Sequence, residues 1–137
     1  MFTPSSDFLK RLLDNLSTAI ILVDDKLHVS YLNPSAEMLL AISRSKAVGH
    51  PLEAIFVDSL GGDIMLKMAK TLKTAHPFTK REAHLRVGIN EVVVDYTVAP
   101  LLSPHEPPAL LIEMQQIDRL LRISREESIL ANHQVTK

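Results

Sequence analysis

Cysteine and tryptophan are both missing from this chain of 137 residues. The absence of cysteine excludes disulfides, thiolate zinc sites, iron–sulfur clusters and cysteine nucleophiles, and it fits a reducing compartment such as the cytosol. Aromatic residues make up only 4% of the sequence, which argues against a surface that stacks single-stranded nucleic acid. The formal net charge is −1, so the composition gives no sign of a nucleic-acid-binding protein.

Long hydrophobic runs are missing too. The longest fully apolar stretches, such as 19–23 and 38–42, have five residues, whereas a membrane-spanning helix needs about 18 or more. The N-terminal segment carries charges throughout and contains no long apolar core, so it does not resemble a secretory signal. We therefore expect a cytoplasmic protein that does not interact with a membrane.

The usual catalytic signatures do not occur. The sequence contains no H-E-x-x-H motif, no G-x-G-x-x-G or Walker loop and no nucleophile elbow. Ser43 and Lys46 have the S-x-x-K spacing but no companion motif, and we interpret them as part of a helix-end turn. No two of the six histidines lie four residues apart, the spacing that would aim both at one metal ion from a helix. We expect neither a catalytic residue nor a metal site.

Hydrophobic residues make up 46% of the chain, enough for the core of one domain with an additional helix. The spacing of apolar residues predicts a first helix over 5–16. Two strands are predicted at 19–23 and 27–32, joined by a turn at two aspartates. Simple alternation in the second strand predicts Tyr31 on the same face as Val29.

Asn33 and Pro34 mark the start of the next helix. Asparagine at the N-cap accepts a backbone hydrogen bond from the first turn, and proline at the first helical position needs no donor. Glu37 falls one residue late for a capping box. We therefore interpret Asn33 and Pro34 as a structural cap.

The second half of the chain predicts a longer helix over 59–75, three strands and a polar terminal helix. The predicted strands cover 78–87, 91–102 and 109–114. Together the elements predict an α+β fold, with a five-stranded antiparallel sheet, helices on one face, and N- and C-terminal helices. The expected divisions are an N-terminal helix at 1–17, a domain at 18–116 and a C-terminal linker helix at 117–137.

The stretch "AIILVDDKLHVSYLNPSAEMLL" and its flanks resemble the beginning of a PAS domain. Such domains begin with a helix and A-x-x-x-x-D, continue with a strand ending in x-N-x-A-x-E, and then have a short helix and a G-x-x-L loop. The matching residues are Ala19, Asp24, Asn33, Ala36, Glu37, Gly49 and Leu52. The three later strands fit the same family, so the resemblance covers nearly the whole chain and implies a PAS fold.

The segments "FLKRLLDNLSTAIILVD", "YLNPSAEMLLAIS" and "DRLLRISREESILANHQVTK" resemble, more narrowly, the N-terminal sensor region of the nitrogen-regulation sensor histidine kinases. The resemblance implies a parent kinase that autophosphorylates from ATP, passes the phosphate to a response regulator and is regulated by a PII-type signal protein. The family's H-E-x-x-N-P box does not occur, and His133 does not match it. The ATP-binding lobe is also missing. We expect the chain alone to be non-catalytic, to carry no cofactor and to act as a regulatory module.

A cofactor-carrying PAS sensor of another signalling protein is the alternative. A flavin–cysteine adduct is excluded because the chain has no cysteine, but haem and non-covalent flavin remain open. His76 and His84 are the candidates for a single axial haem ligand. The candidate lining residues of a ligand cavity are Leu39, Met65, Met68 and Leu72, although methionines at helical spacing also suit an ordinary core.

A homodimer is the expected assembly, because the wide apolar stripe of the first helix has to be buried either against a second copy or on its own sheet. We also expect the strand face with Val92, Val94, Tyr96 and Val98 to lack helices and to contribute. The helical residues predicted at the dimer interface are Phe8, Leu9, Leu12, Leu13, Leu16, Leu120 and Ile123.

Overall fold

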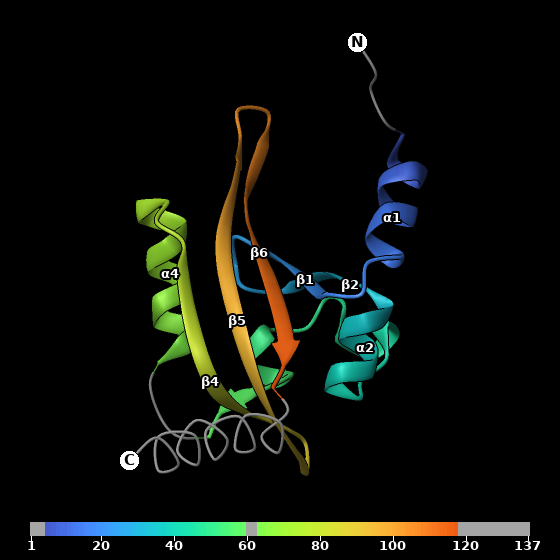
Figure 1. Ribbon diagram of the computed structural model, residues 1–137. Coiled ribbons are helices and arrows are strands. Elements are labelled where there is room, and N and C mark those ends of the chain that lie inside the picture. The colour runs from blue at the N-terminus through green and yellow to red at the C-terminus, as the bar shows by residue number, and fades with distance from the viewer. Residues whose placement is uncertain (1–4, 60–62, 118–137) are drawn as a thin grey trace, which may run out of the picture.

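The structure is a computed structural model that describes residues 5–59 and 63–117 of the chain. Within these residues, six antiparallel strands form one sheet in the order β2-β1-β6-β5-β4-β3 (Figure 1). The strands are β1 (Ala19–Asp24), β2 (Val29–Leu32), β3 (Val57–Asp58), β4 (Phe78–Val87), β5 (Asn90–Ser103) and β6 (Glu106–Gln116). The helices are α1 (Ser6–Asp14), α2 (Pro34–Leu40), α3 (Arg44–Ala47), the 3-10 helix η1 (Leu52–Ala54) and α4 (Ile64–Thr74).

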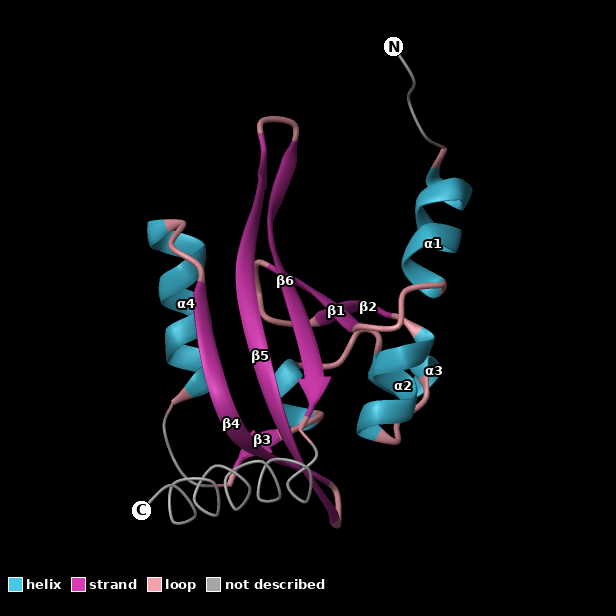
Figure 2. Cartoon of the chain, viewed as in Figure 1, coloured by secondary structure: helices cyan, strands magenta, loops and turns pink. Residues whose placement is uncertain are grey.

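Helices α2, α3 and α4 pack on one face of the sheet (Figure 2). Their buried side chains, among them Ala36, Ala47 and Met68, join the buried residues of the central strands in a single cluster. On the other face of the sheet, residues such as Asp95 and Thr97 stay partly exposed. The predicted α+β class, with helices on one face of an antiparallel sheet, is confirmed.

The sheet has one strand more than the five predicted. The additional strand β3 has only two residues, which pair with Leu85 and Arg86 of β4. Two residues are too short to show the alternation by which a strand is predicted. Strand β3 was therefore not predictable from the sequence pattern, and its presence does not alter the fold class.

Helix α4 begins later than predicted. Ser59 follows β3, and its N–H donates to the carbonyl of His84 at 2.8 Å, so the residue extends the contact with β4 and does not begin a helix. The helix begins at Ile64, where the Asp63 side chain accepts a hydrogen bond from the N–H of Leu66 at 2.9 Å. The prediction of a helix beginning at residue 59 is wrong by five positions.

Strand β2 departs from the predicted alternation because it contains a bulge. The register with β1 is Ile21↔Leu32, Leu22↔Tyr31 and Val23↔Val29. Ser30 is thus an extra residue, and a bulge of this kind changes which face the neighbouring side chains occupy. Val29 and Leu32 are both buried in the core, whereas Tyr31 lies on the opposite face beside Leu22. The prediction that Tyr31 shares a face with Val29 is wrong.

The β5 face that was predicted to lack helices is the core face. Val94, Tyr96 and Val98 are each at most 1% exposed, and Val92 packs against the same cluster. Helix α4 contacts β5 and β6 from this side. These residues therefore cannot form a dimer interface, and that prediction is wrong. The outward-facing residues of the same strand are Val93, Asp95, Thr97 and Ala99.

Two further predictions concern the ends of the chain and its relation to membranes. The predicted terminal helix, with Leu120 and Ile123, lies outside the described residues. Among residues 5–59 and 63–117, none of the helices combines the length and the hydropathy needed to cross a bilayer.

Candidate functional site

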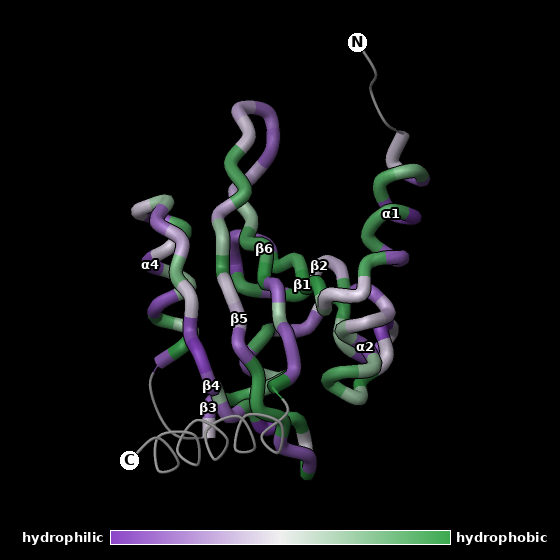
Figure 3. Tube along the Cα trace, viewed as in Figure 1, coloured by the Kyte–Doolittle hydropathy of each residue, from purple (hydrophilic) through white to green (hydrophobic). Residues whose placement is uncertain are grey.

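Helix α1 has no buried residue, although one side of it is apolar (Figure 3). The Ser5 hydroxyl caps it by accepting a hydrogen bond from the N–H of Phe8 at 3.1 Å. The exposed apolar residues are Phe8, Leu9 and Leu12 in the helix and Leu16 two residues after its end, with 38–52% of each accessible. Leu13 is partly buried. The apolar stripe is therefore not packed into the core of its own domain, and the dimer interface proposed for it stays a prediction.

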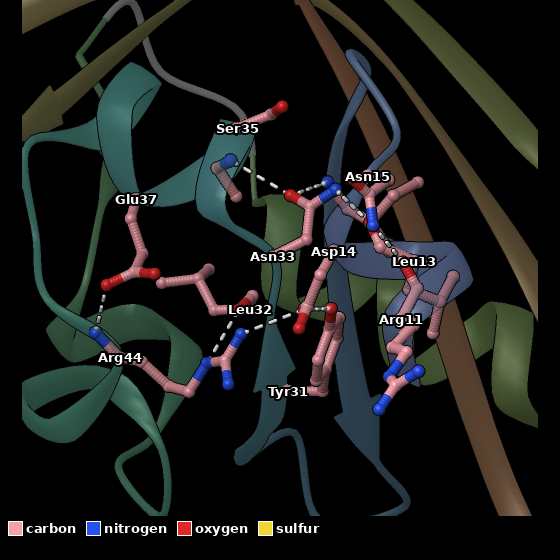
Figure 4. A network of polar contacts seen from close by, with 12 residues as sticks. Arg11, Leu13, Asp14, Asn15, Tyr31, Leu32, Asn33, Ser35, Glu37 and Arg44 are labelled. Carbon is pink, nitrogen blue, oxygen red and sulfur yellow. Dashed lines mark hydrogen bonds and ion pairs between the residues drawn. The ribbon is translucent and has the colours of Figure 1, made fainter. Parts of the chain in front are cut away.

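Asn33 connects α1, β1 and α2 through its side-chain amide, and the residue is completely buried. Its Oδ1 accepts the N–H of Ala36 and the N–H of Ile20, each at 2.9 Å (Figure 4). Its Nδ2 donates to the carbonyl of Leu13 at 3.1 Å and to that of Thr18 at 2.9 Å. All four hydrogen-bonding positions of the amide are thus occupied. One side chain fixes the start of a strand, the start of a helix and the end of α1.

The local cap has the predicted form. Asn33 is the N-cap of α2 and Pro34 occupies its first turn. Glu37 has a different role from the one a capping box would give it. Its Oε2 accepts the backbone N–H of Arg44 at 2.9 Å, so it caps α3, where Ser43 makes no side-chain cap of its own.

Asp14, the last residue of α1, is held by side chains from β2 and α3. The Tyr31 hydroxyl donates to Asp14 Oδ1, and Arg44 Nη2 donates to the same oxygen at 3.1 Å. Arg44 Nε also donates to the carbonyl of Leu32 at 3.0 Å. The guanidinium carbon lies 5.1 Å from the centre of the Tyr31 ring, within the range of a cation–π contact. Three elements that are distant in sequence therefore meet at one carboxylate.

The charges in this group support each other. The hydrogen bond from Tyr31 lowers the pKa of Asp14, and Arg44 lowers it further against the opposing effect of desolvation. Burial and then the hydrogen bond to Asp14 raise the pKa of Tyr31 to about 12. At neutral pH Asp14 is therefore an anion and Tyr31 a neutral donor, which is the combination that the hydrogen bond needs.

Helix α1 is thus attached to the domain mainly at its C-terminal end and by polar groups. Besides the contacts above, the Ser35 hydroxyl donates to the carbonyl of Leu16 at 2.7 Å. We call Asp14, Tyr31, Asn33, Ser35 and Arg44 the α1 junction. Because no apolar side chain of α1 is buried, its orientation depends on these hydrogen bonds and on the ion pair.

Of the α1 junction, the sequence pointed only to Asn33. Tyr31 was missed because simple alternation placed it in the core. Arg44 lies inside the serine and lysine motif that was interpreted as a turn, and α3 does contain it. Asp14 was not predicted because only the apolar residues of its helix were interpreted. The opposite charges of Asp14 and Arg44 are compatible with an ion pair, but the sequence does not show that the two side chains meet.

The residues predicted to line a cavity all belong to the core or pack against it. Met68 is fully buried, and Leu39, Met65 and Leu72 are partly buried against the same cluster, so the predicted cavity stays a prediction. Leu39 also lines an open pocket of about 470 Å³ where α2, the segment before β1 and the end of β6 meet. That pocket includes none of the α4 residues. Its lining is Ser17, Thr18, Ala19, Ser35, Met38, Leu39, Met114, Gln115 and Gln116.

The side chain of Tyr96 places a polar group in the core. The Tyr96 hydroxyl is buried and has no hydrogen-bond partner among the described residues. Its ring meets that of Phe78 edge to face, with 6.1 Å between the ring centres. Burial, together with the Asp58 carboxylate, raises the pKa of Tyr96. The Asp58 carboxylate is itself ion-paired with Lys80.

The two candidate haem ligands do not point into the domain. Ala83 and Leu85 are buried in the core, so His84 between them lies on the opposite face of the sheet. Its Nδ1 is 3.0 Å from Glu91 Oε1. His76 is exposed in the loop after α4. The positions of these two imidazoles give no support to a haem site in the core.

A family model described as the PAS fold matches residues 13–119. The sensory histidine kinase/phosphatase NtrB of Vibrio alginolyticus is 29% identical over 126 residues, which are 92% of this chain and 35% of that protein. The NtrB of Salmonella typhimurium is 31% identical over 118 residues, covering 85% of this chain and 32% of that protein. The chain therefore spans about a third of the length of these curated relatives.

The fold also resembles solved structures. The PAS domain of nitrogen regulation protein NR(II) from Vibrio parahaemolyticus superposes with a TM-score of 0.67 at 24% sequence identity. The superposition covers 83% of this chain and all of that one. This likeness shows the fold, and it agrees with the family match.

Proposed function

The chain belongs to the PAS-fold family, and on that premise we propose that it is the regulatory sensor and dimerisation module of a two-component sensor histidine kinase. The support is the similarity to NtrB proteins over most of this chain. The proposal extends to the activity of the longer relatives, of which this chain covers only about a third.

The finer part of the proposal concerns the pathway. We propose that the parent protein is cytoplasmic, autophosphorylates from ATP and phosphorylates a response regulator in the nitrogen response, under control of a PII-type signal protein. The names of the relatives support the kinase and, through the solved NR(II) domain, the link to nitrogen regulation.

The observation that carries the regulatory role is the state of α1. This helix, together with Leu16 just after it, presents an apolar stripe of four exposed residues and is attached to the sensor core through the polar α1 junction. In a homodimer the stripe becomes buried against the second copy, and a two-fold axis makes the contact equivalent in the two copies. A change in the core that shifts Arg44 or Tyr31 then changes the angle of α1 and hence the dimer.

This role requires neither a catalytic group nor a bound cofactor in the chain. The purified chain should incorporate no phosphate from ATP, and its absorption spectrum should show no band above that of tyrosine and phenylalanine. Stoichiometric haem or flavin absorption would favour the alternative of a cofactor-carrying sensor. Phosphate incorporation would contradict the assignment as a non-catalytic module.

A chimera tests the proposal as a whole. The matching segment of the Salmonella typhimurium NtrB is replaced by this chain, and ATP-dependent autophosphorylation is compared with that of the parent and of a version from which the segment is deleted. We expect the chimera to restore regulated autophosphorylation that the deletion loses. A chimera that behaves like the deletion would contradict the proposed role.

The same chimera can show whether α1 matters for signalling. Changing Leu9 and Leu12 to glutamate should alter the autophosphorylation rate, because both side chains are about half exposed on the apolar stripe. The matched control changes Met38 and Leu66 to glutamate, since these are exposed apolar residues on α2 and α4. The control should leave the rate unchanged.

A further inference from the structure

The hairpin that joins β5 and β6 extends beyond the rest of the sheet. On the β5 side, pairing with β4 begins at Val98, and on the β6 side, pairing with β1 begins at Ala109. Between these two positions, residues 101–108 form a two-stranded projection in which every residue is exposed (Figure 1). We call residues 101–108 the arm. Its strands pair only with each other, and Ser103 pairs with Glu106 at the tip.

The β5 edge of the hairpin is closed to a further strand at its base. The N–H of Ile117 donates to the carbonyl of Val93, and alternation along the antiparallel ladder from that pair fixes which backbone groups face outward. By this alternation Pro100 faces the open edge of β5, whereas the register shift between Leu101 and Ser103 interrupts the alternation before Pro108. Proline has no N–H to offer there, which blocks the addition of a strand. The arm is therefore suited to contacts through its side chains.

The side chains of the arm are unusually apolar for an exposed hairpin. Leu101 and Leu102 are 43% and 57% exposed, and the sequence "LLSPHEPP" adds three prolines. Figure 3 shows the hydrophobic part of the arm below a hydrophilic tip. An isolated two-stranded ribbon is at best marginally stable in water. A ribbon with leucines on its surface gains stability when a second apolar surface covers them.

A second exposed apolar surface, the stripe of α1, lies at the same end of the molecule. Figure 1 shows that α1 projects from the body in the same general direction as the arm. Charged groups flank both apolar surfaces. The arm carries Glu106, and α1 carries Lys10 and Arg11 next to Leu9 and Leu12 in the sequence, with Asp7 in its first turn and Asp14 at its end. Asp14 pairs with Arg44, whereas Glu106, Lys10 and Arg11 take part in no ion pair within residues 5–59 and 63–117.

We propose that the arm packs on the apolar stripe of α1 of a second copy, with Leu101 and Leu102 against Leu9 and Leu12 of that copy. Glu106 then lies near the partner's basic turn. Two-fold symmetry makes the contact reciprocal, so each dimer contains it twice. This inference rests on the proposed homodimer and adds to it a specific pair of surfaces.

The dissociation constant of the dimer, measured by sedimentation, is the first test. Changing Leu101 and Leu102 to serine should weaken the dimer about tenfold or more, as expected for two apolar side chains in the buried part of an interface. The matched control is Ile89→Ser, because Ile89 is fully exposed at the tip of the β4–β5 hairpin. It should leave the dissociation constant unchanged. The circular dichroism spectra of both variants should match that of the wild type, since the altered side chains lie outside the core.

Site-specific cross-linking is the second test, and it is direct because the chain has no cysteine. A Leu102→Cys protein is mixed with an affinity-tagged Leu12→Cys protein and oxidised. A disulfide-linked pair containing one of each is expected. Mixing Leu102→Cys with a Met38→Cys protein, whose thiol lies on α2, should give no such pair.

The outcomes separate this inference from the proposed homodimer. A wild-type chain that stays monomeric at tens of micromolar overturns both. The arm contact alone is overturned by three results together: the variant with Leu9→Glu and Leu12→Glu dissociates the dimer, the arm variant remains dimeric, and the cross-link does not form. If the arm variant dissociates the dimer but the variant with Leu9→Glu and Leu12→Glu does not, the arm does not pair with α1 and that pairing is overturned.

Discussion

Replacing Asn33 by alanine should destabilise the domain far more than the loss of one surface side chain. The change removes the acceptor of the Ile20 and Ala36 N–H groups and the donor to the Leu13 and Thr18 carbonyls. Loss of the helix cap costs about 1 kcal/mol. Ile20 is 4% exposed, and leaving its N–H without an acceptor costs about 1–3 kcal/mol more.

Together these terms predict a loss of about 3 kcal/mol in the free energy of unfolding. For a domain of this size that corresponds to a fall in Tm of roughly 10 °C. Urea denaturation followed by circular dichroism measures the free energy, and the m-value should stay unchanged because the surface exposed on unfolding is the same.

The matched control is Ser35→Ala, in the first turn of α2. That change removes a single exposed hydrogen bond, from the Ser35 hydroxyl to the Leu16 carbonyl, and should cost about 1 kcal/mol or less. The reasoning is refuted if Asn33→Ala costs no more than Ser35→Ala. Such a result would mean that the N–H of Ile20 finds another acceptor and that Asn33 is only a helix cap.

Three more predictions concern α1 and the core. Arg44→Ala should speed hydrogen exchange of the α1 amides and leave the central strands protected, because the guanidinium is one of the groups that hold Asp14. The lowered pKa of Asp14 stabilises the folded state above its unfolded value near 3.8, so the docking of α1 should weaken as the pH falls through the folded value. The raised pKa of Tyr31, about 12, affects stability at high pH. The contribution of Tyr31 to the stability of the folded state is complete below about pH 10 and is lost as the pH rises to the folded value. A pH titration of α1 exchange, with Tyr31→Phe as control, checks both limits. Met68→Ala should cost about 2–5 kcal/mol because the side chain is fully buried, whereas Leu66→Ala on the exposed face of α4 should change stability by about 0.5 kcal/mol or less.

Features set by local chemistry could be predicted from the sequence. Asn33 followed by Pro34 is a complete helix start in itself. Residues 82–87 alternate between polar and apolar, and the predicted strand at 78–87 has the same bounds as β4, although its register with β5 shifts between Lys80 and Ala83. The apolar stripe of α1 was visible for the same reason, since helical spacing alone reveals it.

Features set by pairing between distant segments could not be predicted. The bulge at Ser30 depends on how β2 meets β1, and it alone brings Tyr31 to the face where Asp14 lies. Asp14 and Arg44 are 30 positions apart, and no pattern in either helix shows that they meet. The correct face of β5 likewise required the position of α4, which hydrophobic alternation does not supply.

The account depends most on the claim that α1 is the dimerisation element of this PAS domain. Sedimentation velocity of the wild-type chain, of Leu9→Glu with Leu12→Glu, and of the control Met38→Glu with Leu66→Glu tests it in one experiment. The account predicts a dimer at tens of micromolar for the wild type and the control, and a monomer for the α1 variant with unchanged circular dichroism. A monomeric wild type, or an α1 variant that remains as dimeric as the control, would contradict it.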